Sequence, residues 1–297
     1  LNSSVLKNPI NDQQVGLFNG VDAAIHSIFY AYGDRDKKLL TTKPTFGYYH
    51  PCASLQGMKI IEIPYEGSHF EFPFQEIYKS LLNERPEILI LCNPNNPTGT
   101  ILSARKILEL AQASTQTLIV IDELYEAFLG DSVLPIVDFQ SIPNLLVLRS
   151  LSKTSGLAGL RIGFALGHHD VINRLNRITG PYDINQFAVT AAFAALSDQA
   201  YVDNYVAKVL TARLWIQQEL LKEKVKHHLE AGNYFLLWPK RKASVIEESL
   251  KLAGILVRNM KNKPLIDGSI RVSIGTKSQM KEFWEAYKQV DDLNTLN

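Results

Sequence analysis

Residues 150–163 read SLSKTSGLAGLRIG, a lysine set among small hydroxyl residues and glycines. An apolar run at residues 145–148 leads into this stretch and predicts a buried strand. A lysine forms imines when burial or a nearby cation destabilises its ammonium form, so Lys153 at the end of a strand is a candidate nucleophile. Arg161 is the candidate cation, and a guanidinium also suits an anion such as a phosphate. Taken alone, the stretch fits a surface lysine in a glycine-rich turn slightly better, and other parts of the chain reverse that preference.

Composition narrows the functional classes. The chain has 297 residues, enough for one large domain and a smaller one, and its apolar and charged contents of 46% and 21% are ordinary for a globular protein. A formal net charge of +1 gives no electrostatic reason to expect binding to nucleic acid or to an anionic membrane. No apolar run approaches the roughly 18–20 residues of a membrane span. The two cysteines, Cys52 and Cys92, fit a reducing cytoplasm, which is the expected location.

Short apolar segments alternate with amphipathic ones between residues 20 and 170. Buried strands are predicted over residues 87–92, 117–121 and 144–149. The alternation predicts an α/β fold in which helices cover both faces of a mainly parallel sheet, giving three layers. A long helix over residues 201–221 is expected to lead from this large domain, residues 1–200, into a smaller α+β domain, residues 201–297.

Polar or glycine-bearing residues lie at the ends of two predicted strands and at the start of one predicted helix. Residues 93–100, NPNNPTGT, follow a predicted strand, and their prolines and amides predict a rigid polar loop. Asp122 ends the next predicted strand, where a carboxylate needs a protein donor or a bound cation. Residues 16–24 contain a glycine-bearing turn that opens a helix, a place where free backbone N–H groups bind anions. Because open α/β sheets bind ligands at the carboxyl ends of their strands, the combination favours a site over three ordinary turns.

Four motifs, in their order and spacing, resemble those of the fold-type I pyridoxal-phosphate aminotransferases. They are residues 93–99 (NPNNPTG), 122–125 (DELY), 150–153 (SLSK) and 157–161 (LAGLR). Within that group the chain is most similar to the histidinol-phosphate aminotransferase branch, on residues 44–49, 180–185, 232–235 and 271–276. The resemblance covers nearly the whole chain. It implies the fold-type I architecture, pyridoxal 5′-phosphate as cofactor, a small-molecule amino donor with a keto-acid acceptor, and a homodimer.

The resemblance also implies roles for the residues around the cofactor ring. Lys153 would be the Schiff-base lysine. Asp122 would pair with the pyridinium nitrogen, and this pairing keeps the ring protonated so that it accepts electrons from the substrate. Tyr125 and Asn96 would hydrogen-bond the phenolic oxygen of the ring, and Phe46 would stack on its face.

Two further groups of residues follow from the same resemblance. The cofactor phosphate would be held by Val21, Asp22, Ser150, Ser152 and Arg161. Arg271 would bind the substrate carboxylate or the equivalent end of the substrate. Arg258 would lie near the distal group of the substrate, such as a phosphate.

The chain departs from the family pattern in two places. Relatives usually have a serine and a glutamate on either side of the aspartate at the phosphate helix, where this chain has Val21 and Ala23. Backbone N–H donation survives that change, whereas a side-chain contact from the glutamate does not. Relatives also carry a segment before the position of Leu1 that supplies tyrosines near the substrate, one of them from the partner subunit. Without such a segment we expect cofactor binding to persist while turnover and specificity suffer.

Several alternatives are weighed against this assignment. A decarboxylase of the same fold, similar to the threonine-phosphate decarboxylases, would share most cofactor residues, and a catalytically silent cofactor-binding protein would keep the fold. A nicotinamide site is disfavoured because the glycines of residues 156–163 have the wrong spacing. No metal is expected, because His168–His169 and His227–His228 are adjacent pairs that should not face one ion. A serine hydrolase would need the Gly-x-Ser-x-Gly pattern, which the sequence lacks.

Overall fold

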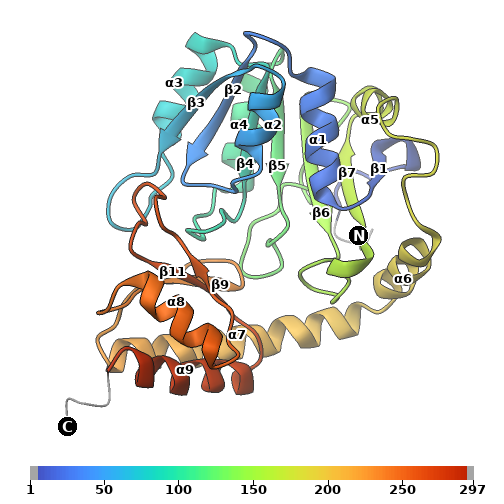
Figure 1. Cartoon of the computed structure of the whole chain (residues 1–297). Helices are drawn as coiled ribbons and strands as arrows, with labels where there is room; N and C mark the ends of the chain where they lie inside the picture. The colour runs from blue at the N-terminus through green and yellow to red at the C-terminus, as the bar shows by residue number, and fades with distance from the viewer. Residues whose placement is uncertain (1–5, 293–297) are drawn as a thin grey trace.

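In the computed structural model, which describes residues 6–292, a seven-stranded sheet and a four-stranded sheet are linked through a long helix (Figure 1). The large sheet has the order β1 (Val15–Phe18), β7 (Gly163–Gly167), β6 (Leu145–Ser150), β5 (Leu118–Asp122), β4 (Ile88–Cys92), β2 (Lys38–Lys43), β3 (Lys59–Pro64). The strands from β3 to β6 run parallel, while β7 is antiparallel to both β6 and β1. The predicted mainly parallel sheet is therefore confirmed.

Helices cover both faces of the large sheet. Side chains alternate between the two faces of a strand, so Ile88 and Ile90 of β4 pack on one side and Leu89 and Leu91 on the other. One face is covered by α1 (Val21–Tyr32), α2 (Tyr49–Leu55) and α5 (His169–Asn176), and the other by α3 (Phe74–Glu84) and α4 (Ala104–Ala113). All five residues of β4 are buried, as a strand between two helical layers requires. The three predicted layers are confirmed.

The parallel arrangement brings distant loops to one edge. Strands β2, β4, β5 and β6 all end at the same side of the sheet, which faces the small sheet in Figure 1. The aromatic stretch after β2, the amide-rich loop after β4, Asp122 at the end of β5 and the lysine loop after β6 therefore meet there.

The small sheet is antiparallel and covered by helices on one face. Its order is β10 (Arg258–Asn259), β11 (Ile270–Ser273), β9 (Tyr234–Trp238), β8 (Lys226–His228). Helices α7 (Gln199–Lys222), α8 (Ala243–Leu252) and α9 (Lys277–Val290) pack on this sheet around Phe235 and Trp284. On the other face, Leu236 contacts Tyr65 and Phe70 of the large part. The division of the chain at residues 200 and 201 stays a prediction, although α7 begins at that point after α6 (Gln186–Ser197).

Two features of the large sheet were not predictable from the sequence pattern. Strand β1 has only four residues, and its glycine, Gly16, lies against the ring of Phe18, so no clear alternation marks it. The apolar pattern predicts a strand over residues 162–166 but not its direction, and the structure makes this strand, β7, antiparallel and inserts it between β6 and β1. Among the described residues, none of the helices combines the length and apolar character that crossing a membrane requires.

Candidate active site

A buried acid stands at the end of β5. Asp122 is 2% exposed and accepts hydrogen bonds from the Tyr49 hydroxyl at 2.7 Å and the Leu124 backbone nitrogen at 3.3 Å. Burial raises the pKa of Asp122 to about 6, and the hydrogen bond from Tyr49, that from Leu124 and the charge of Lys153 only partly oppose this rise. The ionised carboxylate is thus incompletely compensated, so a cation or a protonated ring nitrogen beside it would be favourable.

Tyr49 is a site residue that sequence reasoning missed. It is the first residue of α2, is fully buried, and reaches Asp122 across 73 positions of the chain. Burial and the neighbouring Asp122 raise its pKa well above the ordinary value, so its hydroxyl stays protonated and donates. The only sequence signal was the aromatic density of residues 44–49, which fitted a core or a ring platform equally well.

Lys153 lies in the loop after β6, half-buried, with its Nζ 5.2 Å from the centroid of the Tyr125 ring. Burial lowers the pKa of Lys153, and the positive charge of Arg271 lowers it further, while Asp122 acts in the opposite direction. A lysine with a lowered pKa carries more neutral amine at neutral pH, which is the form that attacks carbonyl carbon and accepts protons.

A chain of polar contacts joins the large and the small sheet above Lys153. The Arg271 Nη1 donates to Asn96 Oδ1 at 2.6 Å, and Asn96 Nδ2 lies 3.5 Å from the Tyr125 hydroxyl. Tyr234, a second residue that sequence reasoning missed, packs its ring edge-on against Tyr125 with centroids 4.9 Å apart and donates to the Asn95 carbonyl at 2.7 Å. The buried Arg271 Nε has no hydrogen-bond partner among the described residues, which leaves a donor for a ligand.

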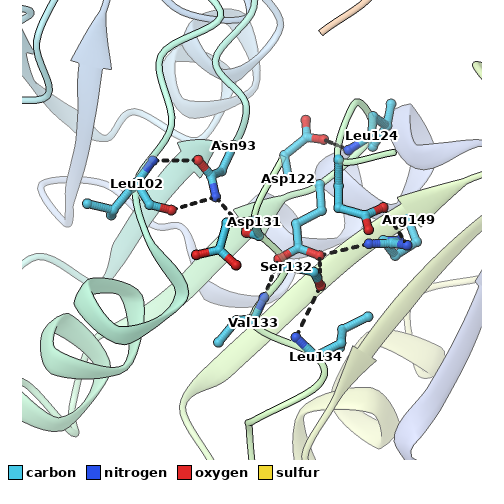
Figure 2. A network of polar contacts seen from close by, with 11 residues as sticks. Asn93, Leu102, Asp122, Leu124, Asp131, Ser132, Val133, Leu134 and Arg149 are labelled. Carbon is cyan, nitrogen blue, oxygen red and sulfur yellow. Dashed lines mark hydrogen bonds and ion pairs between the residues drawn. The ribbon is translucent and has the colours of Figure 1, made fainter. Parts of the chain in front are cut away.

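The amide-rich loop is rigid because its own side chains hold it. Asn93 exchanges two hydrogen bonds with the backbone of Leu102 and also donates to the Asp131 carbonyl (Figure 2). Asn95 is fully buried, donates to the Pro44 carbonyl at 3.0 Å and accepts from Thr45 at 2.7 Å. The loop after β4 is thereby fixed to the loop after β2, and Asn96 is held in place between them.

The start of α1 forms a cradle for an anion. Gly20 has φ 78° and caps α1, and a side chain there would collide with the guanidinium of Arg161. Gly163 allows β7 to approach the backbone nitrogen of Val21. The Val21 side chain lies in the core, so only its N–H can serve an anion. The Asp22 carboxylate forms an ion pair with Arg161 at 2.7 Å, with both side chains partly exposed.

The remaining predicted residues lie around this frame. The Ser150 hydroxyl donates to that of Ser152 at 2.8 Å. Phe46 is half-buried, with its ring edge-on to Tyr49 at 5.5 Å between centroids. Arg258 is exposed on β10, directly opposite Arg271 of β11 in the antiparallel register, so the two side chains share one face of the small sheet.

One geometric argument from the sequence is wrong. Adjacent residues of a helix were expected not to face one ion, yet His168 and His169 have ring centroids 4.0 Å apart and both lie near Asp170. The reason is that His168 stands before the first turn of α5 as its N-cap, where the backbone is extended and not helical. Its Nδ1 accepts the Asp170 N–H, an ordinary capping contact.

The residues present fit pyridoxal phosphate. An undercompensated buried acid at Asp122 suits a protonated pyridine nitrogen, and Lys153 suits a carbonyl-binding amine. The glycine-opened start of α1, with Arg161 against it, suits a phosphate.

Comparisons with known proteins agree with this geometry. Residues 6–286 match the family described as aminotransferase class I and II. A histidinol-phosphate aminotransferase of Geotalea uraniireducens is 33% identical over 273 residues, which cover 92% of this chain and 76% of the relative, and one of Desulfitobacterium hafniense is 30% identical over 279 residues with the same coverage. The crystal structure of the Sinorhizobium meliloti histidinol-phosphate aminotransferase in complex with pyridoxal 5′-phosphate has a TM-score of 0.84 at 23% identity, covering 96% of this chain and 78% of that one, and shows the shared fold.

The cradle at α1 makes a testable prediction. We expect Gly20→Ala to weaken pyridoxal-phosphate binding by roughly 10-fold or more, because the new methyl group displaces the Arg161 guanidinium from the anion site. Gly254→Ala is the matched control, since Gly254 has a similar φ of 81° but nothing within 4 Å of the new Cβ. Equilibrium titration of the cofactor-free protein measures both affinities. Equal losses in the two variants would contradict the prediction.

The raised pKa of Asp122 leads to a second testable prediction, which concerns stability. A carboxyl group whose pKa is higher in the folded than in the unfolded state binds more protons when folded, so its contribution to stability falls as pH rises from 3.8 to about 6. Cofactor-free Asp122→Asn should therefore exceed the wild type in free energy of unfolding by about 2–3 kcal/mol at pH 8, and by little near pH 4.

Urea unfolding of the cofactor-free proteins at several pH values measures this difference. The exposed Asp203→Asn is the control and should show no such trend. A cofactor-free Asp122→Asn protein that is less stable than the wild type at pH 8 would show that Asp122 is well compensated without a ligand.

Proposed function

The chain belongs to the class I and II aminotransferase family and is a pyridoxal-phosphate-dependent aminotransferase, and from this premise we propose that its amino donor carries a distal phosphate, as histidinol phosphate does. The observation that carries the proposal is the pair of arginines on one face of the small sheet. Arg271 and Arg258 stand directly opposite each other, and Arg271 also reaches Asn96 beside the Tyr125 hydroxyl.

We assign each residue at the ring a physical task. When bound, pyridoxal phosphate supplies an electron sink for the substrate carbon that loses its proton. Asp122, held by Tyr49, would keep the proton on the ring nitrogen, because a buried carboxylate stabilises an adjacent positive charge. Lys153 would hold the cofactor covalently, and its amine, with a lowered pKa, would be the acid–base group that moves the substrate proton. Tyr125 and Asn96 would hydrogen-bond the phenolic oxygen of the bound cofactor, and Phe46 would cover its ring face.

The phosphate end of the cofactor is assigned to the α1 cradle. The backbone N–H groups of Val21 and Asp22, the hydroxyls of Ser150 and Ser152, and Arg161 are the proposed donors. Arg161 now pairs with the partly exposed Asp22 carboxylate, and a phosphate with about two negative charges competes well for that guanidinium. The substitution of the usual glutamate by Ala23 removes one side-chain contact but leaves the backbone donors.

The substrate end is assigned to the two arginines. The buried and unpartnered Nε of Arg271, with its Nη1 on Asn96, fixes a guanidinium suited to the group nearest the reacting carbon. Arg258 is exposed and free to meet a more distant anion. A donor that carries a phosphate far from its amino group could use both arginines, whereas an amino acid with an uncharged side chain would leave Arg258 without an anionic partner from the substrate.

An amino-donor screen that includes histidinol phosphate tests the assignment. We expect transamination of histidinol phosphate with a keto-acid acceptor, and loss of borohydride trapping of the cofactor in Lys153→Ala. Arg258→Ala should raise the KM for histidinol phosphate by roughly 10- to 100-fold, because a charge-assisted hydrogen bond contributes about 1.5–3 kcal/mol, and should change the KM for histidinol little.

Arg105→Ala is the control for the loss of an exposed arginine on the far helix α4. An unchanged KM in Arg258→Ala would contradict the phosphate assignment. Carbon dioxide release without a keto product would replace the aminotransferase assignment by the same-fold decarboxylase, and a cofactor absorbance band without turnover of any donor would indicate the silent binding protein.

We further propose that the protein is a cytoplasmic homodimer. Exposed aromatic side chains on and near α6 support an interface, with Tyr182, Phe187 and Phe193 being 92%, 83% and 77% exposed. The free, buried thiols of Cys52 and Cys92 fit a reducing compartment. Sedimentation equilibrium should give twice the chain mass, and Phe187→Asp with Phe193→Asp should shift the protein toward the monomer, whereas a wild-type monomer at all concentrations would exclude the dimer.

A further inference from the structure

A second acid, Glu123, follows Asp122 directly and is buried on the other side of the sheet. The exposed fraction of its side chain is 0%, and it accepts hydrogen bonds from Ser132 Oγ at 2.6 Å and the Val133 nitrogen at 2.9 Å. Its third partner is Arg149 of β6, with Nη1 at 2.9 Å (Figure 2). Each of its contacts is made by protein groups, so Glu123 needs no ligand.

The pair connects the two strands that deliver the proposed catalytic groups. Successive residues of a strand point to opposite faces, and the Glu123 nitrogen continues the β5–β6 ladder by donating to the Leu148 carbonyl at 3.0 Å. Asp122 faces the site while Glu123 faces away from it. On β6, Ser150 borders the lysine loop while its neighbour Arg149 turns back toward Glu123. At the end of β5 and at the end of β6, one residue therefore faces the site, and its neighbour in the chain belongs to the Glu123–Arg149 ion pair on the opposite face of the sheet.

Arg149 holds a second carboxylate as well. Its Nη2 lies 2.7 Å from Glu126 Oε2, so one guanidinium bridges Glu123 and Glu126. These two glutamates flank Leu124 and Tyr125, the segment whose phenol lies beside Asn96 and beneath Lys153. A planar guanidinium that binds two carboxylates has little freedom to rotate. The backbone of Leu124 and Tyr125, which lies between the two glutamates, is therefore held in one direction.

We propose that the Glu123–Arg149–Glu126 cluster is a positioning device that sets the distance and orientation of Asp122 and Tyr125 relative to Lys153. It touches neither substrate nor cofactor and acts through the strand ends. The inference rests on the site roles proposed above and is independent of the identity of the donor. Arg149 and Glu123 line a cavity of about 770 Å³ that lies between the large sheet and α7. The Glu123–Arg149 ion pair provides the side-chain connection between the ends of β5 and β6.

The experiment compares Glu123→Gln and Arg149→Lys with the wild type in the cofactor-loaded protein without any donor. The readout is the pH midpoint of the change in the visible absorption of the bound cofactor, which depends on where Asp122 stands relative to the ring. The group that titrates is the imine nitrogen that joins Lys153 to the cofactor. A displaced Asp122 would hold the proton on the ring nitrogen less firmly, and the ring would then withdraw fewer electrons from the imine. The imine would become more basic, so we expect an upward shift of about half a pH unit or more in both variants. Glu126→Gln leaves the Glu123–Arg149 contact and should give a smaller shift.

Kinetics and stability separate positioning from folding. With a converted donor, kcat should fall roughly 10-fold or more while KM changes less, because misplaced groups cost rate rather than binding. Glu84→Gln, which removes the ion pair between Glu84 at the end of α3 and Lys38 at the start of β2, is the control and should leave the pH midpoint unchanged. A lowered urea midpoint in Glu123→Gln and Arg149→Lys with unchanged pH midpoint and kcat would overturn the proposal. Since the pH titration uses no donor, failure of histidinol phosphate as substrate leaves this test intact.

Discussion

The site depends on a carboxylate that the fold buries at a strand end without fully compensating its charge. Asp122 has one strong donor, Tyr49, and a weaker one from the backbone, and burial still raises its pKa to about 6. Glu123, one residue later, is also buried but has three partners, one of them a cation. Two adjacent acids at the end of β5 thus differ in their environment. Glu123 is satisfied by protein groups, whereas Asp122 remains in need of a positive charge.

The sheet direction explains why these groups meet. Because β2, β4, β5 and β6 are parallel, their carboxyl ends lie together, and the loops that follow can share one site. The loops are then fixed to each other by buried amides, as Asn95 does between the loops after β4 and β2. Such rigidity suits the proposed role of Lys153, since proton transfer to or from a substrate carbon tolerates little error in distance.

Charge is distributed along the site in a consistent order. The acid Asp122 ends β5, the lysine stands beside Tyr125, and the cation Arg161 meets the start of α1. Arg271 from the small sheet adds positive charge near Lys153 and lowers the pKa of that amine further after burial. The small sheet therefore contributes to the electrostatics of the lysine as well as to the surface on which a substrate would lie.

The sequence alone determined the main strands of the parallel sheet through hydrophobic periodicity, and it indicated the family through the order and spacing of its motifs. It also proposed Lys153 and Asp122 as the candidate lysine and acid, because both follow or end predicted buried strands. It left β1 undetected and the direction of β7 open, since a four-residue strand carries too little pattern. Only the tertiary structure revealed Tyr49 on Asp122, Arg149 on Glu123 and Arg271 on Asn96, which join residues 73, 26 and 175 positions apart. Such contacts are decided by how layers and strand ends come together in space, and no local pattern of residues encodes them.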